Sequence, residues 1–259
     1  MKLIRRQVNH IKRIKETYQS IGVKINLPLY VLLKMYRTKK QTKRNDYYRK
    51  KAQDMGYLFT TNTPANLFNE ILFDRPYEIN GFKPKKGDTV IDIGAYYGDS
   101  AIWWAKKFKA KVIAFEPLPE AFNELVKNLK LNGVEDRVIA HNTALGSGTK
   151  ITGGKGKGTM FTYFNQEQTL KTKRLDDFGI DNADIIKIDV EGFEYDVLKG
   201  AVNTIKKLHP KIILEVHSIA LRKKCDFFLN ELGYKLVVEG RAVNSNQKRF
   251  DKVVNLFYA

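Results

Sequence analysis

The chain has 259 residues, enough to bury a full hydrophobic core, and one α/β domain with an appendage fits this length better than two equal domains. Its single cysteine, Cys225, excludes an intrachain disulfide framework and any site built from several cysteines, which is typical of a reducing compartment and predicts a cytoplasmic protein. The net charge of +18 is concentrated in residues 1–51, which hold 16 Lys or Arg against 2 Asp or Glu.

The basic segment of residues 1–51 has the pattern of two amphipathic helices. Apolar residues recur at helical spacing over residues 3–21, and a second helix is predicted from Asn26, with Pro28 in its first turn, to about Tyr36. Its uncharged run is too short to span a bilayer, which takes about 20 apolar residues. We expect these helices to pack on the following domain or a second subunit, to bind an anionic membrane surface as a peripheral membrane protein, or, less favoured, to contact nucleic acid.

The sequence therefore divides into a basic α-helical N-terminal appendage, residues 1–51, and an α/β domain, residues 52–259. A short apolar helix around residues 64–72 precedes the domain's first strand. That strand, Thr89–Ile93, is a continuous β-branched run typical of burial on both faces, and Gly94 and Gly98 then allow a sharp turn into a helix. Such a strand, turn and helix present free backbone N–H groups to a ligand.

Strands and helices then alternate along the chain. The predicted strands are residues 89–93, 111–116, 137–141, 184–189 and 211–216, with helices between them. This alternation predicts a doubly wound, mostly parallel sheet covered on both faces. Two last strands, near residues 234–238 and 253–258, predict a hairpin that adds one antiparallel strand. The Gly- and Lys-rich stretch 146–158 is interpreted as a solvated hairpin loop; the alternative is a flexible lid that contacts a phosphate or an acidic acceptor.

Polar residues close several of these strands: Asp92, Glu116, His141, Asp189, Glu215 and, two residues further, His217. Ligands of doubly wound sheets bind outside the carboxyl ends of the strands, so these side chains are candidates for one crevice. Glu116, 24 positions after Asp92, is placed to accept two hydrogen bonds from a ribose diol. Asp92 would suit an ammonium group. S-adenosylmethionine has both features that these residues suit, because it carries a nucleoside at one end and an amino acid at the other.

At these residues the chain resembles the FkbM family of S-adenosylmethionine-dependent methyltransferases, from about Asn66 onward. The matching blocks are Gly87–Ser100, Ala114–Pro117, Asn128–Asn132, Ala144–Gly146, Leu175–Asp177, Ile186–Gly192 with Glu194, Leu198–Gly200 and Leu214–His217. The resemblance implies a Rossmann-like class I methyltransferase sheet of seven strands and methylation of a hydroxyl. One departure is Tyr96, where the family often has asparagine.

The resemblance also implies where S-adenosylmethionine binds. The methionine end is expected near Asp92, Gly94 and Ala95, the ribose at Glu116, and the adenine at residues 141–144. For His141 a strand-end histidine bonded to backbone is the alternative. The expected cofactor contacts are Asp92, Gly94, Ala95, Tyr96, Gly98, Glu116, Pro117, His141, Asn142, Ala144 and Asp189.

An alcohol needs a base to lose its proton, and His217 or Asp189 is the predicted base, with Glu191 holding the acceptor hydroxyl. Alternatives are a divalent cation on Asp189, Glu215 and His217, or purely structural carboxylates. Lys187, in a buried strand, is expected to pair with Asp189 or Glu215. No Asn-Pro-Pro-Tyr block follows the fourth strand, which favours an oxygen acceptor over an amine.

The sequence thus predicts an O-methyltransferase acting on a glycan, a glycolipid or another small metabolite. The competing interpretations are an RNA methyltransferase whose basic appendage holds the phosphate backbone, and a non-enzymatic scaffold that binds lipid or a partner. The acceptor, metal dependence and oligomeric state are not fixed by the residues.

Overall fold

The computed structural model describes residues 41–64, 67, 76–152, 169–241 and 254–259. The chain forms two compact units, residues 1–83 and 84–259. The helices predicted within residues 1–40 and near residues 64–72 lie outside the described residues, apart from Pro64 and Leu67, so the helical appendage and its boundary at residue 51 stay predictions. Among the described residues, no helix is long and apolar enough to cross a lipid bilayer.

In the first unit, one arginine of the basic segment holds a loop in place. It lies on α3 (Gln41–Asp54), where the guanidinium of Arg49 donates hydrogen bonds of 2.6–3.2 Å to four carbonyls, those of Phe59, Thr60, Thr61 and Thr63. The planar guanidinium suits such multiple contacts because its donors are fixed in one fork. At least this positive charge therefore has a structural role.

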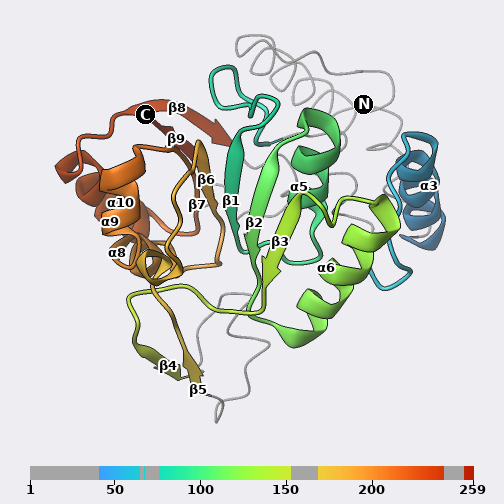
Figure 1. Ribbon diagram of the computed structural model, residues 1–259, viewed down its shortest axis with the longest axis horizontal. Coiled ribbons are helices and arrows are strands. Elements are labelled where there is room, and N and C mark those ends of the chain that lie inside the picture. Colours follow the sequence, from blue (N-terminus) through green and yellow to red (C-terminus); the bar gives the residue numbers. More distant parts are fainter. Residues whose placement is uncertain (1–40, 65–66, 68–75, 153–168, 242–253) are drawn as a thin grey trace, which may run out of the picture. The chain divides into compact units, whose positions relative to one another are not determined.

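The second unit is built on a seven-stranded sheet with the order β3-β2-β1-β6-β7-β9-β8 (Figure 1). Its strands are β1 (Thr89–Ile93), β2 (Lys111–Phe115), β3 (Val138–His141), β6 (Ile185–Ile188), β7 (Lys211–Val216), β8 (Leu236–Arg241) and β9 (Val254–Tyr258). The first five pair in parallel, and β9 lies antiparallel between β7 and β8. The predicted parallel sheet and its antiparallel addition are confirmed.

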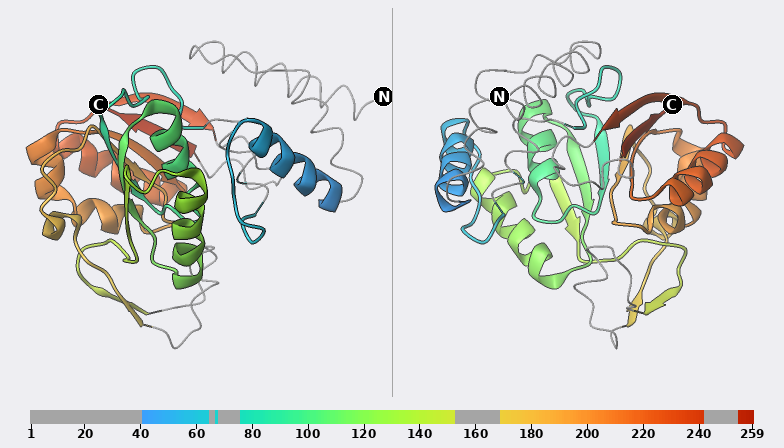
Figure 2. Two further views of the ribbon diagram at one scale, coloured as in Figure 1. Left: turned by 45° about the vertical axis from the view of Figure 1, so that its right-hand side comes forward. Right: turned by 180° about the vertical axis from the view of Figure 1, so that it is seen from behind.

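Helices cover both faces of this sheet, as Figure 2 shows. One face carries α5 (Asp99–Trp103), which continues as the π-helical turn η3 (Trp104–Phe108), and α6 (Pro119–Asn132). The other carries α8 (Glu194–Lys199), α9 (Val202–Leu208) and α10 (Ile219–Glu231). Between the sheet and this second layer lies an apolar core that includes Ile91, Ile186, Leu214, Leu198 and Leu229. Burial of both faces explains the unbroken apolar strands.

A small hairpin stands apart from the main sheet. Strands β4 (Lys150–Thr152) and β5 (Thr169–Lys171) pair antiparallel, so residues 150–152 of the stretch predicted as a hairpin loop form a strand instead. The connection between them lies outside the described residues and includes Lys155 and Lys157, on which the lid interpretation depends. The short 3-10 helix η4 (Leu175–Phe178) leads back to the sheet.

A buried ion pair joins the two central strands. The ammonium of Lys187 on β6 lies 3.0 Å from the Asp92 carboxylate on β1 and donates a 2.8 Å hydrogen bond to the Gly94 carbonyl. Ser100 donates to the other Asp92 oxygen at 2.6 Å. Burial would lower the pKa of Lys187, but Asp92 and Asp189 outweigh it and raise that pKa. The expected pair with Asp189 is present at 3.8 Å; its closer partner Asp92 was not expected.

Removing this cation should destabilise the fold, because Asp92 would keep a buried charge without its partner. We expect Lys187→Met to lower the free energy of unfolding by about 3–5 kcal/mol, and Lys187→Met combined with Asp92→Leu to recover part of that loss. Urea unfolding followed by circular dichroism measures both. The exposed Lys130→Met is the control, expected within about 0.5 kcal/mol; an equally small effect at Lys187 would contradict this account of the ion pair.

Candidate functional site

The turn after β1 requires a glycine at its first position. Gly94 has φ 83°, and a Cβ atom there would lie 1.8 Å from the Asp189 carbonyl oxygen of the neighbouring strand end. Gly98 also has a positive φ, and it caps α5. Tyr96 is a non-glycine residue with φ 47°, a conformation that asparagine tolerates better than tyrosine. The asparagine that the resemblance implies at this position would therefore fit this backbone conformation better than the tyrosine present.

Glu116, just beyond β2, is tied to this turn. It is buried; one carboxylate oxygen accepts from the Tyr96 N–H and the other from the Leu118 N–H, each at 2.8 Å. Burial raises the pKa of Glu116 to about 7, against the opposing effect of the two hydrogen bonds. Asn142 donates to the carbonyls of Glu116 and Pro117, at 2.9 and 3.2 Å. Each Glu116 oxygen has a second lone pair, so the carboxylate can still accept from a ligand hydroxyl.

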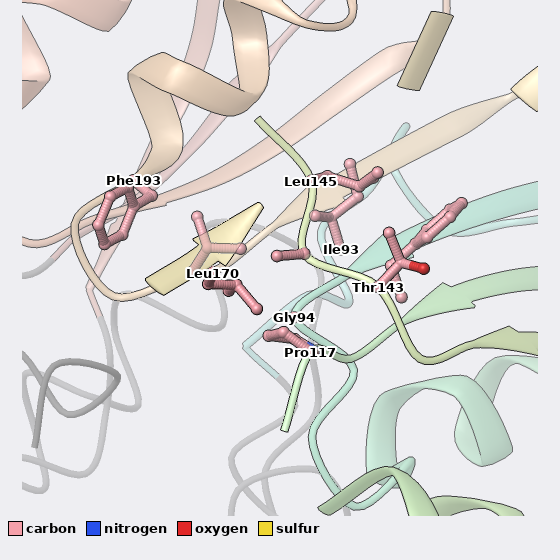
Figure 3. A pocket seen from close by; sticks show the side chains of 10 residues that line it. Ile93, Gly94, Pro117, Thr143, Leu145, Leu170 and Phe193 are labelled. Atoms are coloured by element: carbon pink, nitrogen blue, oxygen red, sulfur yellow. The ribbon is translucent and has the colours of Figure 1, made fainter. Parts of the chain in front are cut away.

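A largely apolar pocket opens beside the turn, between the ends of β1, β2, β3 and β6 (Figure 3). Its empty space, including the part open to solvent, is about 310 Å³, near the lower end of small-ligand sites. The lining residues are Ile93, Gly94, Phe115, Pro117, Thr143, Ala144, Leu145, Leu170, Val190 and Phe193. The structure thus brings three of the expected cofactor contacts, Gly94, Pro117 and Ala144, to one cavity.

Other expected contacts lie outside this lining. Asp92 is fully buried within β1, and both its oxygens face protein groups, Lys187 and Ser100; the ammonium group that the sequence led us to expect beside Asp92 is thus supplied by the protein itself. Ala95 is buried. His141 stacks on Phe115, with ring centroids 5.0 Å apart, and contacts Phe178 edge-on. Its pKa is lowered by burial and by Lys173, so the ring is neutral near pH 7.

The predicted catalytic residues do come together, around the imidazole of His217. Its Nδ1 lies 2.9 Å from the Glu194 Oε1 atom. Its Nε2 faces three more carboxylates, those of Glu191 at 3.3 Å, Glu215 at 3.6 Å and Asp189 at 4.0 Å. We call these five residues the His217 cluster. Asp189 and Glu191 flank Val190, which lines the pocket, so the cluster adjoins that cavity.

The carboxylates change the charge of His217. Burial would lower its pKa, but the hydrogen bond that the ring donates to Glu194 and the charges of Asp189, Glu194 and Glu215 raise that pKa to about 10. The ring is therefore protonated near neutral pH in the metal-free chain, and an imidazolium cannot accept a proton. The ligand atoms of Asp189, Glu215 and His217 lie within 4.8 Å of one another, so the same residues that hold a proton are spaced as candidates for a cation.

Two partners in this site were missed from the sequence. Glu194 stood in a matching block without a role, yet it is fully buried and bonds His217, 23 positions away. The pocket wall formed by Leu145 and Phe193 was also not expected to face a ligand, whereas Thr143 falls in the segment expected at the adenine. No local pattern marks either, because each contact joins segments that meet only in the folded sheet.

Comparisons with known proteins show which family and which solved fold the chain resembles. Residues 92–236 match the family model of the methyltransferase FkbM domain. Methyltransferase sdnD of Sordaria araneosa is 25% identical over 229 residues, which cover 71% of this chain and 88% of that protein. The hexuronic acid methyltransferase AglP of Haloferax volcanii is 28% identical over 147 residues, 52% of this chain but only 58% of AglP. A solved methyltransferase FkbM from Methylobacillus flagellatus is 19% identical, with a TM-score of 0.50 over 83% of this chain and 59% of that one.

The charge of His217 can be tested by its titration in metal-free buffer. We expect NMR to show an imidazolium up to about pH 10, and Glu194→Gln to lower that midpoint by at least about one unit. Since the folded pKa exceeds the unfolded value, the linked stability is fully present below about pH 6.5 and lost as the pH rises to about 10. His141 is the internal control, expected below its ordinary pKa; a His217 midpoint near 6.5 would refute the charge assignment.

Proposed function

The chain belongs to the FkbM methyltransferase family, and from this premise we propose that it is an S-adenosylmethionine-dependent O-methyltransferase acting on a hydroxyl of a glycan, a glycolipid or another small metabolite. Membership of the family implies methyl transfer with S-adenosylmethionine as donor. The oxygen acceptor and its class are our proposal. The observation that carries it is the apolar pocket at the glycine turn with the His217 cluster beside it.

The donor would occupy the pocket at the turn. Glu116 would accept hydrogen bonds from the ribose hydroxyls, and the walls at Pro117 and Ala144 would enclose the adenine and ribose. The charged methionine end would lie near Gly94, whose carbonyl oxygen already accepts a hydrogen bond from the buried Lys187. The apolar lining supports this placement, because it excludes water from a reactive sulfonium.

The acceptor hydroxyl would enter from the side of the His217 cluster. A sulfonium is already a strong methyl donor, so the enzyme has to align the hydroxyl and take its proton. We assign the proton to a carboxylate, Glu191 before Asp189, because His217 is already protonated. Glu191 is 38% exposed, with its side chain 3.3 Å from Nε2. The donor would supply the methyl group: the sulfur–carbon bond would break to leave a neutral thioether as the oxygen–carbon bond forms, and Glu191 would receive the hydroxyl proton.

A sugar acceptor is supported by the likeness to a hexuronic acid methyltransferase. Carboxylates are the side chains that hold neutral hydroxyl groups by accepting their hydrogens. The basic residues 1–51 would bring the enzyme to an anionic membrane surface, where glycolipids lie. Nucleic acid is the alternative partner for this segment, and steep salt dependence of RNA binding would favour it.

Donor binding should depend on the carboxylate of Glu116. We expect affinity for S-adenosylmethionine to fall by up to about tenfold per pH unit below pH 7, because protonation removes a ribose acceptor. Glu116→Gln should lose this pH dependence and bind about 10- to 100-fold more weakly, the loss of charged hydrogen bonds. Calorimetry from pH 5.5 to 8 measures both. A pH-independent affinity in the native chain would argue against ribose recognition by Glu116.

Transfer should depend on the His217 cluster. With labelled donor and glycan, lipid and RNA fractions of cells, we expect label in a glycan or glycolipid. Glu191→Gln should lower kcat by about 10²–10³ because it removes the base, and His217→Ala should lower kcat because it removes the positive charge among the carboxylates. In both variants the dissociation constant for the donor should change less than about twofold. The exposed Glu120→Gln is the control.

Two outcomes would count against this assignment. Equal loss of donor binding and transfer in His217→Ala would place that ring in the donor pocket wall. Label confined to RNA would replace the proposed acceptor with nucleic acid.

A further inference from the structure

The Nε2 atom of His217 lies among carboxylate oxygens at distances that suit a shared ion. The nearest oxygens of Glu191, Glu215 and Asp189 are 3.3, 3.6 and 4.0 Å away, beyond the usual hydrogen-bond range of about 2.7–3.2 Å. Ligand atoms at about 2.1 Å from one metal ion are instead about 3.0–3.4 Å apart when adjacent and about 4.2 Å apart when opposite. Small side-chain rotations would bring Asp189, Glu215 and His217 to such spacing.

The histidine ring is already held in the orientation that a metal ligand needs. Glu194 is fully buried on α8, and its Oε1 atom is hydrogen-bonded to Nδ1 of the ring at 2.9 Å. A carboxylate in this position leaves Nε2 as the atom that faces the other acids, the arrangement common behind metal-bound histidines. The second oxygen of Glu194 is also buried and has no hydrogen-bond partner among the described residues.

An independent observation comes from β9. Asn255 is 1% exposed, and neither its Nδ2 nor its Oδ1 atom has a hydrogen-bond partner within the part of the chain that the structure describes. It pairs with Glu215 in the β7–β9 ladder, and directly opposite residues project from the same face of a sheet. A buried amide without partners is costly. An ion beside Glu215, or a water molecule bound to it, would give the Oδ1 atom of Asn255 a partner.

From these contacts we propose that Asp189, Glu215 and His217 bind a divalent cation, with Asn255 completing the site and Glu194 orienting the histidine, and that this ion holds the acceptor oxygen. Two carboxylates and one imidazole favour first-row ions such as Mn²⁺ or Zn²⁺ over Ca²⁺, which prefers oxygen ligands alone. The use of the ion rests on the proposed methyl transfer; its binding does not.

The place of the site explains what the ion would do. Val190, between Asp189 and Glu191, lines the donor pocket, so an acceptor oxygen on the ion would lie beside the transferred methyl group. The ion would polarise the hydroxyl and stabilise the oxyanion as the proton leaves. Glu191, outside the proposed ligand set, would then receive that proton.

The test is Mn²⁺ binding to the metal-depleted chain of 259 residues without donor or acceptor, followed by electron paramagnetic resonance and calorimetry. We expect one tight site per chain. Glu215→Gln and Asn255→Leu should each weaken it at least tenfold, and Glu194→Gln about 10- to 100-fold. Glu120→Gln, an exposed acid on α6, should bind as the native chain does. Circular dichroism identifies any variant that fails to fold, and the isosteric Glu215→Gln is the variant least exposed to that failure.

Two results would overturn the proposal: no Mn²⁺ binding at millimolar concentration, or equal affinity in the native chain and folded Glu215→Gln. Methyl transfer with S-adenosylmethionine, assayed separately, distinguishes this failure from that of the proposed function. Transfer without a tight Mn²⁺ site removes the ion and keeps the methyltransferase. A tight Mn²⁺ site lost in Glu215→Gln, in a chain that transfers no methyl group, supports the ion and refutes the acceptor chemistry.

Discussion

The buried cation of Lys187 is the interaction on which the geometry of the site depends. It joins β6 to β1 through its ion pair with Asp92, and it donates a hydrogen bond to the carbonyl oxygen of Gly94. Gly94 is the first residue of the turn that borders the pocket. Because the ammonium and the Asp92 carboxylate are almost without solvent, each needs the other to remain charged. Two side chains thus hold the turn in place. The Lys187 ammonium donates to the Gly94 carbonyl, and Glu116 accepts from the Tyr96 N–H.

The sequence predicted the fold well because periodicity and breakers are local signals. Continuous β-branched runs such as Thr89–Ile93 are typical of strands covered on both faces, and a glycine such as Gly133, which ends α6 in a left-handed conformation, is a typical helix stop. The strand-end rule also indicated the edge of the sheet at which the pocket lies. It could not indicate which way a side chain faces: Asp92 lies within its strand and turns toward Lys187, a residue 95 positions later, which no local pattern reveals.

Two kinds of acidic group meet at this edge and serve different purposes. Glu116 is isolated, buried and bonded to two backbone N–H groups, which keeps one carboxylate in a fixed place with a raised pKa. The acids around His217 are crowded, and their mutual repulsion is relieved only by a positive charge among them. A proton on the imidazole supplies one such charge in the metal-free chain. Glu116 is therefore suited to a few fixed hydrogen bonds with a ligand, whereas the acids of the His217 cluster create a strongly negative potential.

The position of β9 has a consequence for the order of assembly. Strand β9 follows β8 in the chain but lies between β8 and β7, so β8 cannot join the sheet until β9 has been synthesised. A nascent chain can complete the five parallel strands and still leave the β7 edge unpaired. The backbone groups of an unpaired edge can pair with another chain, so this intermediate is prone to intermolecular association. Asn255 would reach Glu215 only at this late step. Pairing of β9 with β7 would then complete the acidic site around Glu215 and cover the open edge of the sheet in the same folding step.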